Sequence, residues 1–103
     1  MAKYLFIYTG GDQPGPDDDM AAITNAWVVW FASLGDAVVD PGNPVGASGA
    51  IASDGSVTAA TSGVGGYSVV NADSLEAALE MAKGSPQLAA NGSVEVFETF
   101  DVM

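Results

Sequence analysis

The segment that most constrains the fold is residues 3–9, Lys-Tyr-Leu-Phe-Ile-Tyr-Thr, because it is apolar on both faces of an extended chain. Side chains alternate along a strand, so Tyr4, Phe6 and Tyr8 share one face, and the two aliphatic residues between them share the other. A strand that is apolar on both sides is typical of the centre of a sheet whose two faces are both covered. The rest of the chain, or a second copy of it, must therefore provide two covers.

A helix predicted over residues 18–34, ending at Gly35, provides the first cover. Beyond its acidic start this helix carries no charge, and Trp27 and Trp30 fall on one apolar stripe at a spacing of 100° per residue. We interpret the tryptophans as part of a buried helix face rather than as a dedicated ligand motif. The predicted stripe consists of Met20, Ile23, Trp27, Trp30, Phe31 and Leu34.

A second helix is predicted to begin at Asp73, with Glu76 three residues later completing a capping box. Gly84 and Pro86 end it, and the residues after Pro86 have the composition of one further helical turn. Its predicted buried stripe consists of Leu75, Ala78, Leu79 and Ala82.

Short strands are predicted at residues 37–39, 66–72 and 93–102. Between the first two, Asp54-Gly55 in a Gly/Ala/Ser-rich stretch indicates a β-hairpin; a mobile flap is the alternative. The order predicts an α+β fold, a ferredoxin-like split βαβ with an extra β-hairpin, in a single domain of residues 1–103. Both helices then cover one sheet face. We expect Tyr4, Phe6 and Tyr8 on the other face, covered by a second copy in a homodimer.

Composition excludes several functions. The chain has 13 acidic residues against two lysines, Lys3 and Lys83, no arginine, and a formal net charge of −11. Nucleic acids and anionic membrane surfaces are therefore disfavoured as partners.

Without histidine or cysteine the chain has no Ser-His triad or thiol nucleophile, and we expect no metal and no cofactor. The acidic run at residues 17–19 lacks the ligand spacing of a calcium loop. No signal-peptide pattern or membrane-length apolar run is present, which predicts a cytoplasmic protein.

Carboxylates and phenols remain as the side chains that could take part in catalysis. Asp36 and Asp40 flank an apolar segment and are candidate catalytic residues, because apolar walls raise the pKa of a carboxyl group; two solvated aspartates are the alternative. For a ligand cleft the predicted residues are Trp30, Tyr8 and Asp36. Trp30 lies nearer the edge of the helix stripe, whereas Trp27 is expected at its buried centre.

Residues 3–11, 30–45 and 65–98 resemble the YCII-related family and its DGPF-type branch. The most specific block is the last one, with Gly-Gly-aromatic, a strand, Asp-Ser-Leu-x-x-Ala, a helix, Pro, and then Gly-x-Val-Glu-Val. The resemblance implies a ferredoxin-like dimeric α+β barrel whose two sheets pack face to face.

The family's Asp-Gly-Pro-Phe motif falls on residues 54–57, where only Asp54 and Gly55 are retained. Thr24 occupies the place of the family's suspected catalytic histidine, and Ser85-Pro86 that of its Asp-Pro. No catalytic residue is therefore carried over from the family.

Three functions remain open. The first is a small homodimer that binds a small organic molecule in an aromatic and apolar cleft. The second is an enzyme without a metal that uses Asp or Tyr for proton transfer on a small organic substrate. The third is a purely structural assembly module.

Overall fold

The computed structural model describes residues 2–102. Its centre is an antiparallel sheet with the strand order β2-β5-β1-β6. The predicted α+β class is confirmed, and the strand predicted at residues 3–9 lies between two others. The four strands are β1 (Ala2–Gly10), β2 (Val38–Asp40), β5 (Val64–Ala72) and β6 (Gly92–Glu98).

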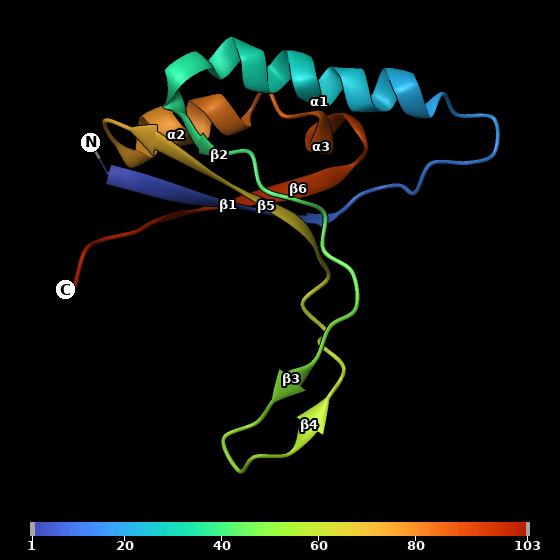
Figure 1. Cartoon of the computed structure of the whole chain (residues 1–103), viewed down its shortest axis with the longest axis vertical. Coiled ribbons are helices and arrows are strands. Elements are labelled where there is room, and N and C mark those ends of the chain that lie inside the picture. Colours follow the sequence, from blue (N-terminus) through green and yellow to red (C-terminus); the bar gives the residue numbers. More distant parts are fainter. Residues whose placement is uncertain (1, 103) are drawn as a thin grey trace.

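The helices all lie on one side of this sheet (Figure 1). They are α1 (Met20–Leu34), α2 (Leu75–Ala82) and α3 (Pro86–Ala89), with a 3-10 turn, η1 (Gly35–Ala37), after α1. The Asp19 carboxylate caps α1 by accepting from the backbone N–H groups of Ala21 and Ala22. Gly35, at φ +58°, ends α1 as predicted.

The start of α2 corrects a prediction. Ser74, not Asp73, is the N-cap, and its hydroxyl oxygen accepts from the backbone N–H of Ala77 at 3.1 Å. Either residue type can cap a helix, so the sequence alone did not decide between neighbours. The α2 stripe is also narrower than predicted. Ala78 and Ala82 are buried, but the two leucines of the stripe are more than 40% exposed.

The placement of Tyr4, Phe6 and Tyr8 was predicted on the wrong face. All three are buried beneath the helices, where the Phe6 ring stacks on Trp30 at a centroid distance of 6.3 Å. The alternation itself was predicted correctly. The large rings turn toward the helices because the indoles of α1 offer the more extensive apolar contact there.

The opposite side of the sheet carries smaller and partly exposed apolar residues. Leu5 lies between Val69 on β5 and Phe97 on β6, and Ile7 pairs with Tyr67. These five residues form what we call the open sheet face. Phe97 is 48% exposed and the other four are half-buried, so nothing within residues 2–102 covers this face completely.

The hairpin predicted at Asp54-Gly55 is present. β3 (Ala50–Ile51) pairs with β4 (Val57–Thr58), and Gly55 adopts φ +88° in the turn between them. Residues 46–63, which we call the arm, project from the sheet on the side away from the helices (Figure 1). The radius of gyration is accordingly 15.2 Å, compared with about 13 Å for a compact domain of this length.

Candidate ligand-binding cleft

A cleft of about 460 Å³ opens between α1 and the end of the sheet where β1 finishes and β5 begins. Its size is within the range of small-molecule sites. It is lined by Tyr8, Gly10–Pro14, Ile23, Thr24, Trp27, Phe31, Pro41–Pro44, Gly65–Tyr67, Gln87 and Ala90.

Three aromatic rings form the inner wall of the cleft. Trp27 and Phe31 are four residues apart on α1, so they lie on the same side of the helix with ring centroids 6.0 Å apart. The Trp27 indole meets the Tyr8 ring edge-on, with a centroid distance of 5.0 Å and an interplanar angle of 75°. Edge-to-face contacts of this kind stabilise aromatic clusters. The wall is therefore built from packed rings, and Trp27 remains partly exposed at its edge.

The phenol of Tyr8 already forms a hydrogen bond within the fold. Its hydroxyl donates to the Ser68 hydroxyl oxygen at 2.7 Å, and Ser68 in turn donates to the carbonyl oxygen of Pro41 at 2.7 Å. Burial raises the pKa of Tyr8, and the hydrogen bond with Ser68 only partly opposes this. Tyr8 thus stays protonated near neutral pH, and its proton already has an acceptor. It contributes a ring to the cleft rather than a base.

One rim of the cleft follows the segment after β2. The Asp40 carboxylate accepts from the backbone N–H of Gly42 at 2.8 Å. The backbone carbonyl oxygen of Asn43 accepts from the backbone N–H of Tyr67 at 3.4 Å. Gly42 lies so close to β5 that a Cβ atom there would overlap the carbonyl oxygen of Tyr67, and its φ is +75°. Only glycine fits this position, so the tight approach of the rim to the sheet depends on it.

The opposite rim is held by side-chain amides. Gln87 on α3 donates to the carbonyl oxygens of Thr9 and Gly10 at 3.0 and 3.1 Å. Asn91 donates to the Asp12 carboxylate at 2.6 Å, and the Asp12 backbone N–H donates to Ala90. These contacts tie the chain that leaves β1 to the α3–β6 turn.

In the described part of the chain, the lining of the cleft carries negative charge and no positive charge. Among residues 2–102, Asp12 is the only charged residue that lines the cleft, and neither lysine is part of the lining. Within residues 2–102, every buried side-chain nitrogen or oxygen atom has a hydrogen-bond partner. The cleft therefore offers aromatic surface, a few exposed polar groups and one carboxylate, but no cation that would bind an anionic ligand.

The structure brings only one of the predicted site residues, Tyr8, to the cleft. Trp30 is 7% exposed and outside the lining; its indole N–H donates to the carbonyl oxygen of Met81 at 3.2 Å. The burial expected of Trp27 and Trp30 is therefore reversed, because α2 approaches α1 at Trp30 and buries it. Asp36 and Asp40 are exposed and also lie outside the lining.

Sequence reasoning did not identify Trp27, Phe31, Asn43 or Gln87 as lining residues. The four-residue spacing of Trp27 and Phe31 signalled a shared helix face, but not which end of the sheet that face would meet. For Gln87 there was no local signal, because its partners are backbone carbonyls about eighty residues away in the sequence.

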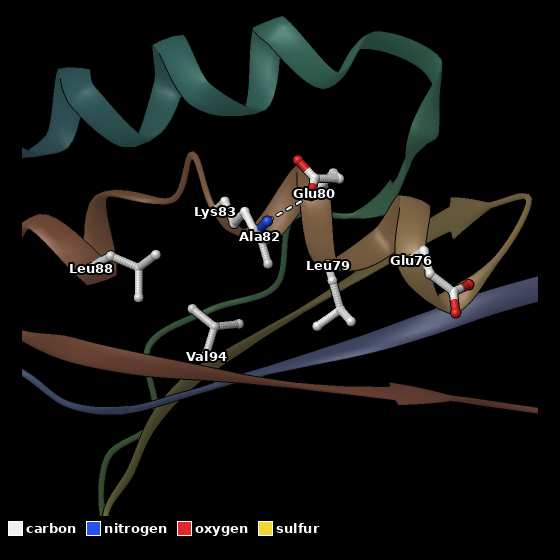
Figure 2. Close-up of a pocket in the computed structure, with 7 residues that line it drawn as sticks. All are labelled: Glu76, Leu79, Glu80, Ala82, Lys83, Leu88 and Val94. Atoms are coloured by element: carbon white, nitrogen blue, oxygen red, sulfur yellow. Dashed lines mark hydrogen bonds and ion pairs between the residues drawn. The ribbon is translucent and has the colours of Figure 1, made fainter.

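A second groove of about 310 Å³ lies between α2, α3 and β6 (Figure 2). Leu79, Leu88 and Val94 point into it from these three elements. The charged groups at its edge include Glu80 and Lys83, which form an exposed ion pair with each other. This groove lacks the aromatic wall of the first cleft, and we regard it as the weaker candidate.

Comparison with family models, with curated proteins and with solved structures gives no match to this chain. None of the helices between residues 2 and 102 has the length and apolar character that a membrane crossing requires. Function is therefore inferred from the geometry of the cleft and the sheet.

Proposed function

We propose that this protein binds a small organic molecule with a flat apolar or aromatic body in the cleft beside Trp27. The observation that carries the proposal is the wall of Tyr8, Trp27 and Phe31, which presents ring surface to a space of ligand size. Rings of this kind stack on flat ligands and also attract organic cations through their negative faces.

The ligand we propose is neutral or positively charged. Asp12 is the single charged residue that the described part of the chain places in the lining, and the chain as a whole carries a formal charge of −11. An anionic ligand would lose hydration on entering the cleft without gaining an ion pair. Binding is favoured over catalysis because Tyr8 donates its proton within the fold, and neither Asp36 nor Asp40 borders the cleft.

We further propose that the fold is ferredoxin-like and that the chain is a YCII-related protein. The strand order supports the fold assignment, since two βαβ units, β1-α1-β2 and β5-α2-β6, interleave in one antiparallel sheet. In this family two sheets pack face to face in a dimer. The corresponding surface here is the open sheet face of Leu5, Ile7, Tyr67, Val69 and Phe97.

The ligand proposal is tested with three probes of one shape and different charge: benzylamine, benzyl alcohol and benzoate. The chain has two tryptophans, so a ¹H–¹⁵N spectrum contains two indole N–H signals, which Trp27→Phe assigns. Benzylamine and benzyl alcohol should shift the Trp27 signal in a saturable manner, while benzoate should not and the Trp30 signal should stay nearly constant.

Asp12→Asn is the control for charge. It should weaken benzylamine binding while leaving benzyl alcohol binding unchanged. Leu88→Ala, which alters the second groove, should affect neither probe. If backbone amide signals in the same spectrum still shift saturably with benzylamine in both Phe31→Ala and Trp27→Ala, the ligand binds elsewhere and the proposal is refuted.

A further inference from the structure

Among residues 2–102, the arm of residues 46–63 pairs with no strand of the four-stranded sheet. Its two strands are two residues long and pair only with each other. A two-stranded hairpin is at best marginally stable in water when nothing covers it. The side chains of Ile51 and Val57, which are paired directly opposite each other, are 75% and 70% exposed.

The surface area of the chain leads to the same conclusion. Its accessible surface is 6946 Å², which is about 1,600 Å² more than expected for a compact monomer of 10.3 kDa. A standard protein–protein interface removes about 800 Å² from each partner. The excess is thus large enough to form an interface with another molecule.

The distribution of charge indicates what that molecule is. Of the 15 charged residues in the chain, the arm contains only Asp54. The five residues of the open sheet face are uncharged; the charged neighbours on that side of β1 and β6 are Lys3 and Glu95, which have opposite signs. Two chains of charge −11 repel each other unless they meet where charge is scarce. Both surfaces are poor in charge, and both lie on the side of the sheet away from the helices (Figure 1).

We propose that the arm is an assembly element that packs against a second copy of this chain, with Ile51 and Val57 seated on the partner protomer. A twofold dimer buries both the arm and the open sheet face, because each protomer contributes one arm and receives one. The inference rests on the homodimer put forward above and extends it. The open sheet face forms the centre of the interface, and the arms clasp it from outside.

The test is sedimentation equilibrium of the full chain at micromolar concentration. Ile51→Asp combined with Val57→Asp should raise the dimer dissociation constant by roughly 100-fold or more, because each protomer loses two apolar anchors and brings two charges into the interface. The circular dichroism spectrum should be retained, because both side chains are at least 70% exposed in their own protomer. Ser53→Asp, which adds one negative charge in the hairpin turn, should leave the dissociation constant nearly unchanged.

Val69→Asp on the open sheet face separates the two proposals. If it dissociates the dimer while the arm variant does not, the arm inference is overturned and the sheet dimer stands. If the arm variant alone dissociates the dimer, the arm inference stands and the face-to-face packing fails. A wild-type chain that is monomeric at 100 µM refutes both, and the ligand titration still tests the cleft.

Hydrogen exchange provides a second readout that does not depend on any variant. In a dimer the backbone amides of residues 50–58 should exchange more slowly at 100 µM protein than at 0.1 µM. Equal exchange of these amides at both concentrations, in a protein that sediments as a dimer at 100 µM and as a monomer at 0.1 µM, would also overturn the arm inference.

Discussion

Replacing each tryptophan by alanine should separate a structural indole from a ligand-facing one. Trp30 is 7% exposed, its ring is 4.9 Å from that of Phe31, and its N–H donates to Met81 on the neighbouring helix. Trp30→Ala removes a buried aromatic side chain and should cost about 3–5 kcal/mol of unfolding free energy. Trp27 is only partly buried, so Trp27→Ala should cost about half as much.

A loss of this size is a large part of the stability of a small domain. Trp30→Phe is therefore the more informative variant. It retains most of the ring, but removes the donor to the Met81 carbonyl, which still accepts from the backbone N–H of Gly84. The lost hydrogen bond and the smaller ring together should cost about 1–2 kcal/mol.

The assay is equilibrium urea unfolding followed by far-UV circular dichroism. For a domain of this size an m-value of about 1–1.5 kcal/mol/M converts a loss of 1.5 kcal/mol into a midpoint lowered by about 1 M. Trp27→Phe, the matched control, should lower the midpoint by less than half of that and instead alter ligand binding. A larger loss for Trp27 than for Trp30 would refute the assignment of their roles.

Three other measurements test the cleft and the charge balance. Gly42→Ala should destabilise the chain by about 2–4 kcal/mol, because φ is positive and the added Cβ would overlap the Tyr67 carbonyl; Gly46→Ala, which has open space around it, should change the urea midpoint little. Raising NaCl from 20 mM to 1 M should increase the melting temperature by roughly 5 °C or more, since screening relieves the repulsion of a chain with −11 formal charge; a flat melting temperature would contradict this. Stability should fall above pH 10, because burial raises the pKa values of Tyr8 and Tyr4 from 10.0 and the unfolded chain releases those protons first. Absorbance at 295 nm should then show tyrosinate appearing together with unfolding, and Tyr8→Phe should weaken this alkaline loss.

The elements of the fold were predictable because each has a local cause. The charge-free stripe and Gly35 determined the first long helix, and Asp54-Gly55 determined the hairpin. The alternation of residues 3–9 separated two sets of side chains correctly. It did not determine which set the helices would cover, because both sets are apolar and the choice depends on how well each fits the facing helix.

The site was less predictable, because its residues come together from distant segments. The position of an indole on a helical wheel gives its angle, but not the place where a second helix crosses. Met81 is 51 residues from Trp30 in the chain, yet its carbonyl oxygen accepts the indole proton. The same applies to Asp36 and Asp40, since an apolar stretch between two aspartates does not bury them if it forms a short edge strand.

One segment of the chain joins the cleft to the arm, so the two proposals are physically connected. The segment from Pro41 to Pro44 forms one rim of the cleft, and the backbone N–H of Val45 then donates to Gly65 at the root of the arm. A partner that fixes the arm would also fix this rim, and a ligand that orders the rim would orient the arm. Coupling between two binding events is reciprocal, so a ligand that strengthens dimerisation must itself bind the dimer more tightly, by the same factor. The two proposals can therefore be tested separately, but if both hold they should not be energetically independent.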